Sequence, residues 1–288
     1  MLITPASDRY SPSVQGVIVL ATYNEVGSIR PVLAEVEEAV SVLRRADVHL
    51  RILLVDDSSP DGTAGVAKEE ASRLGLQLEV LSGTKSGLGR ALMRGFAHSL
   101  EASAPPDFFI TLDADGQHDA RQIPDLIRAH LARGSAVTIG SRWARGGTSP
   151  GTPPHRVVLS RVGNLLVRRI AGVRRVRDAT TSFRVINSEV VRAFRADELR
   201  VEGYGFFSAF IALSQARGFV IDEVPINFRP RYSGVSNLTS KELLDFFMNL
   251  FKVRRQAREI RRDADASPTT GSADIGAVVS APPAPRER

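Results

Sequence analysis

The chain contains an apolar run, residues 108–112, that ends in two aspartates, Asp113 and Asp115. An uninterrupted apolar run of this length is typical of a strand buried in a parallel sheet. Residues two apart in an extended chain point to the same side, so the two carboxylates can converge on one cation. Hard oxygen ligands of this kind suit Mg²⁺ or Mn²⁺. The same pattern also fits a polar loop after a core strand, and the rest of the sequence has to distinguish the two.

Alternating strands and helices surround this run. Strands are predicted at residues 17–20, 52–55, 78–81, 108–112 and 136–140, and helices between them at about 31–43, 63–74, 90–98 and 122–132. Strands that alternate with helices of about ten residues favour a parallel, doubly wound sheet with helices on both faces. The sequence therefore predicts an α/β fold built on a mostly parallel, twisted sheet.

Acidic or glycine-rich segments follow successive predicted strands. Asp56 and Asp57 follow the second strand, residues 83–90 follow the third, and Asp113 and Asp115 follow the fourth. Ligands bind at the carboxyl ends of strands in open α/β sheets, so these groups are expected together at one edge. Residues 83–90 lack the spacing of a dinucleotide-binding motif or a P-loop, and they fit either a helix-start turn or a phosphate-facing loop.

Composition excludes several classes of function. The chain has no cysteine and a net charge of +6. It therefore has no disulfide framework, thiol nucleophile or cysteine-ligated zinc, and anionic partners are favoured. The N-terminus lacks an apolar signal-peptide core, and no segment reaches the roughly 18 apolar residues of a spanning helix. These features predict a cytoplasmic protein.

Arginine is concentrated in residues 142–184, where ten arginines accompany a single acidic residue, Asp178. A helix is predicted over residues 156–175. Within it, three arginines recur every seven residues opposite an apolar stripe: Arg161, Arg168 and Arg175. Such a helix fits either a solvated charge face over ordinary core or an anionic membrane surface.

The C-terminal part of the sequence is predicted to close the fold. Residues 178–196 and 206–216 are expected to form a covering helical layer. Residues 220–229 contain Pro225 and are expected to form an edge strand. A second amphipathic helix is predicted near residues 241–262, with phenylalanine and leucine at its start and a basic end.

These segments divide the chain into four predicted parts. A flexible leader at residues 1–13 precedes a folded domain at residues 14–235. A basic, membrane-surface helix is assigned to residues 236–262. Residues 263–288 are rich in Ala, Ser, Pro and Thr, which is typical of a disordered tail.

Several of these segments together resemble the family 2 glycosyltransferases with a Rossmann-like GT-A fold, and specifically the dolichol- or polyprenol-phosphate mannose synthases. Seven matching stretches follow one another in family order: 21–25, 55–63, 85–91, 113–118, 140–142, 182–184 and 223–236. Each stretch is a weak match alone, and the order of all seven carries the resemblance.

The resemblance implies roles for particular residues. Nucleotide binding is assigned to residues of the first two loops: Thr22, Tyr23, Glu25 and Asp56. The metal and the sugar diphosphate are assigned to the D-x-D-x-Q element: Asp113, Asp115 and Gln117. Phosphate groups, including that of the acceptor, are assigned to three basic residues: Arg142, Arg156 and Arg231. Asp115 and Arg142 are the two expected to act directly in catalysis.

The implied reaction moves mannose from GDP-mannose to a polyprenyl phosphate with inversion. Mg²⁺ or Mn²⁺ would neutralise charge on the leaving diphosphate. The acceptor phosphate is already mostly anionic at neutral pH, its second pKa being about 6, so it needs positioning rather than a general base. The enzyme would bind peripherally at the cytoplasmic face of a membrane, either directly or through a membrane-anchoring protein.

Three alternatives remain open at the level of sequence. The same fold could use UDP-glucose or another nucleotide sugar. It could also transfer to a hydroxyl group, which requires a base such as Asp119 or Asp178. A nucleic-acid-binding module is disfavoured, because the acidic sheet edge would repel a polyanion. Three departures from the family pattern, two of them on the acceptor side, make acceptor identity the least defined part: Ala21, Ser182 and Asn237.

Overall fold

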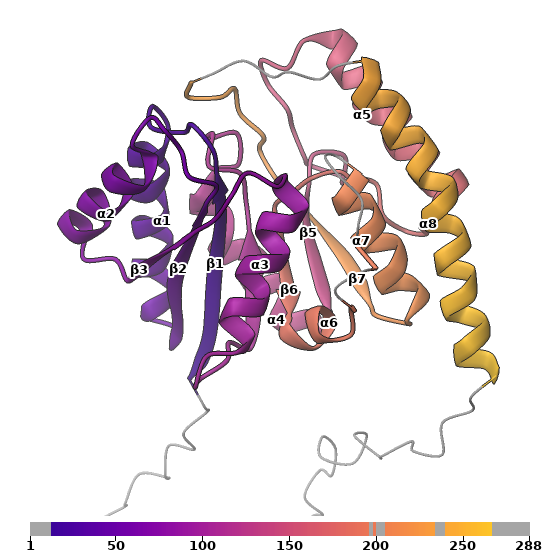
Figure 1. The fold of residues 1–288 in the computed structure, drawn as a ribbon, viewed down its shortest axis with the longest axis horizontal. Helices are drawn as coiled ribbons and strands as arrows, with labels where there is room; N and C mark the ends of the chain where they lie inside the picture. The colour runs from indigo at the N-terminus through magenta and orange to yellow at the C-terminus, as the bar shows by residue number, and fades with distance from the viewer. Residues whose placement is uncertain (1–12, 196–197, 200–204, 234–239, 267–288) are drawn as a thin grey trace, which may run out of the picture.

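A seven-stranded sheet in the order β3-β2-β1-β4-β6-β5-β7 runs through the protein (Figure 1). The computed structural model describes residues 13–195, 198–199, 205–233 and 240–266. The strands are β1 Val14–Thr22, β2 Val48–Asp56, β3 Leu78–Ser82, β4 Phe108–Thr111, β5 Val137–Ser141, β6 Arg184–Asn187 and β7 Ile221–Pro225. The helices are α1 Ile29–Arg44, α2 Thr63–Leu74, α3 Leu88–Leu100, α4 Ile123–Arg133, α5 Pro154–Leu166, α6 Ser188–Arg192, α7 Gly205–Ala216 and α8 Ser240–Ala266, with short turns η1 Ala120–Gln122 and η2 Val167–Ala171.

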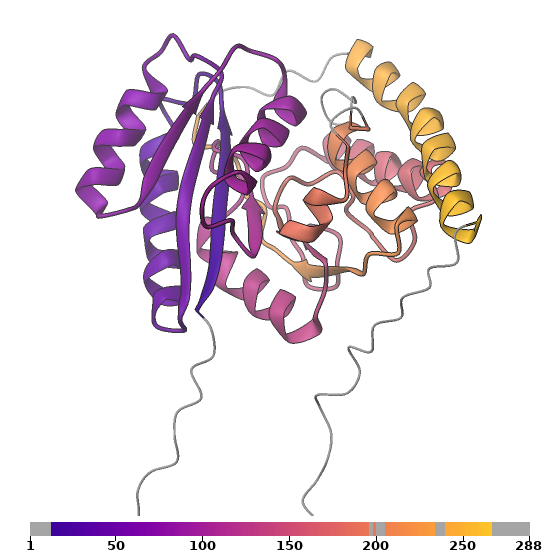
Figure 2. The same ribbon diagram turned by 60° about the horizontal axis from the view of Figure 1, so that its bottom comes forward.

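The N-terminal half is the parallel α/β unit that the sequence predicts. β1 pairs in parallel with β2 and β4, and β2 pairs in parallel with β3. Helices cover both faces of this sheet, as the turned view in Figure 2 shows. In β1, Val17 and Val19 join the apolar cluster that includes α3 and α7, whereas Ile18 and Leu20 join the one that includes α1 and α4. Burial on both faces explains the continuous apolar run of this strand.

The prediction that residues 178–196 belong to a covering helical layer is wrong for residues 184–187. These residues form β6, which lies between β4 and β5 and is antiparallel to both. Its first residue, Arg184, is fully buried and donates to the carbonyl oxygens of Ala179, Thr181 and Phe207 at 2.9, 2.9 and 3.0 Å. Because β6 has only four residues and begins with a charged one, its sequence does not show the apolar pattern of a buried strand.

The helix predicted over residues 156–175 is present, but it ends four residues earlier than predicted. α5 begins at Pro154 and passes into the π-helical turn η2, and Gly172 ends it with a left-handed backbone, φ 75°. Arg175 lies beyond this end with φ 62°, so the three arginines do not share one helix face. The apolar stripe divides between core and surface: Leu166 and Ile170 pack against the core, whereas Leu159 and Val162 are 36% and 46% exposed.

The outermost strand and helix of the C-terminal part follow the predictions more closely. β7 is an edge strand, as Pro225 indicates, and it pairs in parallel with β5. α8 extends to Ala266, past the predicted end of the helix at residue 262. It packs on α7 and η2 through Leu250, Val253 and Ala257. Within the residues that the structure describes, no helix has the length and apolar character needed to cross a membrane.

Two of the predicted parts lie mostly or partly outside the described residues. Of the leader at residues 1–13, only Ser13 is described, and of the tail at residues 263–288, only residues 263–266 are described. The glycine–serine segment that contains Asn237 also falls outside the described residues. The proposed leader and disordered tail therefore stay predictions.

Replacing Arg184 with leucine should lower the free energy of unfolding by about 3 kcal/mol or more, because three buried carbonyl groups lose a charged donor. Urea denaturation followed by circular dichroism measures this loss. Arg192→Leu on the exposed side of α6 is the matched control. If the two variants lost equal stability, Arg184 would not be holding the 179–184 segment.

Candidate active site

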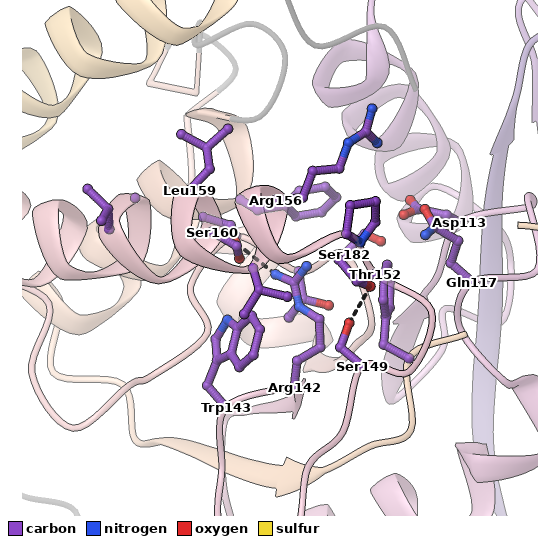
Figure 3. Close-up of a pocket in the computed structure, with 18 of the residues that line it drawn as sticks. Asp113, Gln117, Arg142, Trp143, Ser149, Thr152, Arg156, Leu159, Ser160 and Ser182 are labelled. Atoms are coloured by element: carbon purple, nitrogen blue, oxygen red, sulfur yellow. Dashed lines mark hydrogen bonds between the residues drawn. The ribbon is translucent and has the colours of Figure 1, made fainter. Parts of the chain in front are cut away.

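The carboxyl ends of β1, β2, β4 and β5 meet at one edge of the sheet, where the predicted site residues lie. A cavity of about 660 Å³ opens at this edge. The predicted residues that line it are Asp113, Gln117, Arg142, Arg156 and Arg231. Figure 3 shows Asp113 and Gln117 on one side of the cavity and Arg142 with Trp143 on another. The structure thus brings the D-x-D-x-Q element and all three predicted phosphate-binding arginines to one space.

The turn after β4 holds its two carboxylates through local hydrogen bonds. Asp115 is buried, and its Oδ1 accepts from the backbone N–H of Gln117 at 3.0 Å. Gly116 has φ 80°, and a side chain there would collide with the ring of Tyr232. This glycine therefore allows both the turn and the close approach of the segment that contains Tyr232.

His118 orders the same turn and was not among the predicted site residues. Its ring is buried between those of Phe183 and Phe228, and burial lowers its pKa to about 4. The neutral ring can therefore accept the backbone N–H of Asp113 at Nδ1, 3.3 Å away, while Nε2 lies 3.2 Å from Thr181 Oγ1. Its place in the matching stretch 113–118 was the only sequence signal for it.

Arg231 neutralises the predicted metal ligands in this structure. Its Nε lies 3.2 Å from Asp115 Oδ2 and donates to Gln117 Oε1 at 3.0 Å. Burial raises the pKa of Asp113. Burial and the charge of Asp113 raise the pKa of Asp115. The positive charge of Arg231 lowers both pKa values. The site is therefore one where two crowded carboxylates favour a compensating cation.

The donor chemistry at this turn fits Mg²⁺ or Mn²⁺ only in part. Asp113, Asp115 and Gln117 offer hard oxygen atoms, which these ions prefer. Among the described residues, however, no group of three His, Cys, Asp or Glu side chains could hold a metal ion. An ion bound here would need further oxygen atoms from a ligand such as a diphosphate, and it would compete with Arg231 for Asp115.

The residues assigned to the nucleotide lie at the same edge without lining the cavity. Asp56 is buried, and its carboxylate accepts from Thr22 Oγ1 at 2.9 Å and from Ser59 Oγ at 2.6 Å. Burial raises the pKa of Glu25, the charge of Asp115 raises it further, and the charge of Arg231 lowers it. The loop after β1 therefore lies close enough to the D-x-D turn and Arg231 for their charges to interact. The structure gives Asp56 an evident role in fixing the two loops.

Residues 83–87 form a turn that leads into α3 at Leu88, which is one of the two interpretations left open by the sequence. Gly87 has φ 92° and directly precedes the helix. The buried carboxylate of Asp57 accepts from the N–H of Ser86 at 3.2 Å and from Arg94 at 2.7 Å. Lys85 places its ammonium group 3.7 Å from the ring centre of Tyr23. A phosphate-facing role for this loop stays a prediction.

Arg142 is held by a buried ion pair. Its Nε and Nη2 donate to the two oxygens of Asp178, both at 2.7 Å, and its guanidinium lies 5.0 Å from the ring centre of Phe228. Burial alone would raise the pKa of Asp178, but the charge and hydrogen bonds of Arg142 hold it below its usual value. The guanidinium is therefore fixed in one orientation beside the cavity.

The two aspartates considered as general bases do not have the properties of one. Asp178 forms an ion pair with Arg142 and is fully buried. Asp119 pairs with Arg121 at 2.8 Å and lies 3.5 Å from Arg229, and these partners outweigh burial and keep its pKa low. A general base works best with a pKa near the working pH, so neither residue suits that role.

A further network was missed entirely by sequence reasoning. Arg229 donates to both oxygens of Glu35 at 2.8 Å, and the hydroxyl of Tyr232 also bonds to Glu35. The backbone N–H groups of Arg229 and Tyr232 donate to the carbonyl oxygens of Gln117 and Asp115 at 2.8 and 2.9 Å. Residues 229–232 are thereby bound across the 115–117 turn. The one available signal was a glutamate on the buried face of α1.

A mostly parallel sheet with a D-x-D turn and fixed arginines at its carboxyl edge defines the protein as a glycosyltransferase of the GT-A class. The chain belongs to glycosyl transferase family 2, whose model matches residues 17–194. This confirms the resemblance inferred from the seven ordered stretches.

The most informative relatives carry related names. An undecaprenyl-phosphate mannosyltransferase from Micrococcus luteus is 34% identical over 77% of this chain and 86% of that protein. A polyprenol monophosphomannose synthase from Mycolicibacterium smegmatis is 32% identical over 86% of this chain and 88% of that protein. A dolichol-phosphate mannosyltransferase from Pyrococcus furiosus is 32% identical over 85% of this chain, which spans only 65% of that protein's length.

Solved structures share the fold at low identity. Glucosyl-3-phosphoglycerate synthase from Mycobacterium tuberculosis, in complex with Mn²⁺, uridine-diphosphate and glucosyl-3-phosphoglycerate, gives a TM-score of 0.55 at 19% identity, over 90% of this chain and 82% of that one. A mannosyltransferase from Pyrobaculum calidifontis, in complex with GDP-Man and Mn²⁺, gives 0.52 at 14% identity, over 89% and 76%. These similarities support the GT-A architecture.

Replacing Asp178 with asparagine should lower the free energy of unfolding by about 3 kcal/mol at pH 7, because Arg142 is left buried without its partner. The pKa of Asp178 is depressed in the folded protein, so its stabilising effect is present above the ordinary value of 3.8 and is lost as the pH falls through the lower folded value. Denaturation at several pH values should show the wild-type advantage shrinking below pH 3.8.

The matched control for this prediction is Asp125→Asn. Asp125 pairs with Arg128 at the same distance, 2.7 Å, but both side chains are mostly exposed. Its loss should cost less than about 1 kcal/mol. A wild-type advantage over Asp178→Asn that did not change with pH would contradict the ion-pair account.

Proposed function

We propose that this protein transfers mannose from GDP-mannose to a polyprenyl phosphate, with Mg²⁺ or Mn²⁺ as cofactor and with inversion at the anomeric carbon. The observation that carries the proposal is the two-part lining of the cavity. One part of the lining presents Asp113, Gln117 and Arg142, and another part is apolar. The apolar lining comes from α5 and α8: Leu159, Val162, Leu166, Leu243, Phe246 and Phe247. A polyprenyl phosphate has the same division between a charged head and an apolar chain.

The names of the relatives support mannose as the sugar and a polyprenyl phosphate as the acceptor. Three of them, each at least 32% identical, are named for mannose transfer or mannose synthesis with dolichol, polyprenol or undecaprenyl phosphate. The proposed donor, GDP-mannose, follows from the same resemblance. UDP-glucose is the alternative donor to be tested beside it.

The chain's own residues would act mainly by positioning. Arg142, preorganised by Asp178, and Arg156, which also lines the cavity, would bind phosphate oxygens without the need to reorganise during the reaction. Asp113, Asp115 and Gln117 would hold the divalent ion, and Arg231 would exchange its carboxylate partner for phosphate. The ion, when bound with the donor, would stabilise charge on the leaving diphosphate.

A phosphate acceptor also fits the properties of the two aspartates considered as bases. The attacking oxygen of a phosphate monoester is largely ionised at pH 7, so no side chain has to remove a proton. A hydroxyl acceptor would need such a group. Asp119 and Asp178, the two candidates, are bound to arginines and have lowered pKa values. This favours the phosphate over the hydroxyl acceptor.

Peripheral membrane association is part of the proposal. Large apolar side chains are exposed on both α5 and α8, among them Val158 at 60% and Leu244 at 60%. Soluble proteins rarely expose clustered side chains of this kind without a partner. We place this surface against the cytoplasmic face of a membrane, where a polyprenyl phosphate would present its head to the cavity.

The donor and the cofactor can be tested together. Purified protein with a short-chain polyprenyl phosphate should move label from GDP-mannose, and not from UDP-glucose, into an organic-extractable product. EDTA should abolish this transfer, and Mg²⁺ or Mn²⁺ should restore it. Transfer that survives EDTA would exclude the metal assignment, and a preference for UDP-glucose would exclude the donor assignment.

The pH dependence of transfer tests the absence of a base. With Asp119→Asn, the rate should fall by less than about a hundredfold, through lost positioning alone, since removal of a true base costs about 10²–10⁴. The acidic limb of the rate profile should stay near pH ~6, because it reports the second ionisation of the acceptor phosphate. Disappearance of that limb in the variant would identify Asp119 as a catalytic base instead.

A further inference from the structure

A second, strongly basic cavity lies at the far end of the α5–α8 helix pair. Its volume is about 390 Å³, and it shares no lining residue with the catalytic cavity. Six arginines line it, from η2 and its following turn on one side and from α8 on the other: Arg168, Arg169, Arg174, Arg254, Arg258 and Arg261. Its described lining contains no acidic residue. We call this group of residues the arginine pocket.

Among the described residues, Arg254 is the one of these arginines whose guanidinium has a hydrogen-bond partner, and none of the six is paired with a carboxylate. Arg254 is half-buried and donates to the carbonyl oxygens of Arg169 and Ile170 at 3.3 and 3.1 Å, which are orphan acceptors at the end of η2. Among the described residues, the other five guanidinium groups make no hydrogen bond or ion pair. Glu259, on the same helix, faces Arg255 at 3.6 Å instead. Six clustered cations without a carboxylate repel one another and favour a bound anion.

The chemistry of the pocket favours a phosphate group over a carboxylate. Guanidinium groups bind phosphate oxygens through paired hydrogen bonds, and donors from several directions can surround one tetrahedral anion. Here the donors come from two separate elements, η2 and α8, which pack on each other. The anion would therefore tie the two helices together.

The surface beside the pocket favours a lipid phosphate over free phosphate as the ligand. On α8, Phe247, Phe251, Arg254, Arg258 and Arg261 follow one another at spacings of four and three residues, which places them on one helix face. Phe247 and Phe251 are 37% and 49% exposed. This face therefore changes from apolar to basic over about 20 Å. A phospholipid combines an anionic head with apolar chains, whereas free phosphate would leave the apolar part unused.

We propose that the arginine pocket binds the phosphate head group of an anionic phospholipid and so fixes the orientation of the protein on a membrane. In Figure 1, α5 and α8 lie together on the side of the molecule away from β1–β3. A head group in the pocket and acyl chains along Phe251 would turn the apolar part of the catalytic cavity toward the lipid. The value of this orientation for catalysis rests on the proposed function, whereas binding of a head group can be measured without any sugar transfer.

The test compares two triple variants of the full chain in binding to vesicles. Arg168, Arg258 and Arg261→Gln removes three exposed charges from the pocket and leaves the structural Arg254 in place. Arg44, Arg45 and Arg192→Gln removes three exposed charges elsewhere and is the matched control. The measurement is flotation with phosphatidylcholine vesicles that contain or lack phosphatidylglycerol, with melting curves to verify folding.

Wild-type protein should bind the phosphatidylglycerol vesicles, and the pocket variant should bind them about 100-fold more weakly, as expected for three basic residues at an anionic surface. The control variant should change binding by less than about threefold. Equal losses in both variants would mean that net charge alone attracts the membrane, and that result would overturn the proposal, as would unchanged binding in the pocket variant.

Two further arms separate the alternatives. The first arm measures melting temperatures in inorganic phosphate and in chloride of equal ionic strength. If phosphate stabilised wild type but not the pocket variant, and the two bound vesicles equally, the pocket would be a free-phosphate site and the proposal would fail. Transfer to a soluble, short-chain polyprenyl phosphate should be the same in wild type and pocket variant. Absence of transfer in both would contradict the proposed function and leave the vesicle result standing.

Discussion

The buried ion pair between Arg142 and Asp178 is the interaction on which the active-site architecture depends. Asp178 also lies within reach of Asn164 on α5, whose amide side chain donates to Ser160 O and accepts the N–H of Ala179 at 3.0 and 2.7 Å. One carboxylate thereby connects the end of β5, helix α5 and the segment that leads into β6. Burying two charges is costly unless each is fully hydrogen-bonded, and here that condition is largely met. The result is a fixed cation beside the cavity.

A second buried carboxylate joins the two ends of the fold. Glu35 on α1 is bonded to Arg229 and Tyr232, which lie almost two hundred residues later in the chain. This connection holds residues 229–232 over the turn that contains Asp115 and places Arg231 against it. The catalytic edge is thus assembled from both ends of the chain, although the D-x-D element itself belongs to a single turn.

Sequence patterns were sufficient where one local rule determined the structure. β1, β2, β4 and β5 are largely apolar and buried on both faces, whereas the edge strand β3 is only partly buried. The acidic residues that follow β2 and β4 lie together because parallel strands share an edge. β6 was not predicted, because its leading residue, Arg184, is buried by bonds to carbonyl oxygens of the preceding turn and of Phe207 on α7, which the sequence pattern does not indicate. The α5–η2 helix ends at Gly172, but the seven-residue spacing of arginines led to a prediction that continued to residue 175. The role of Glu35 was not predicted, because its partner Arg229 lies far away in the sequence.

Helices α5 and α8 connect the catalytic cavity with a proposed lipid-binding surface. Their apolar side chains line the cavity, and η2 and the end of α8 form a separate basic cluster. This side of the molecule therefore offers apolar contacts for lipid chains and positive charge for lipid head groups. Neither helix is explained by the core alone, because their apolar side chains are partly exposed. We propose that the cavity accepts a phosphate at the charged part of its lining and an isoprenoid at the apolar part.

The most direct test is a comparison of two acceptors that differ only in the phosphate. Labelled sugar transfer from GDP-mannose is measured with a short polyprenyl phosphate and with the free alcohol of the same chain. We predict transfer to the phosphate and at least about a thousandfold lower kcat/KM with the alcohol, because the guanidinium groups lose their charged partner and neither Asp119 nor Asp178 suits the role of a base. Comparable transfer to both acceptors would contradict this prediction.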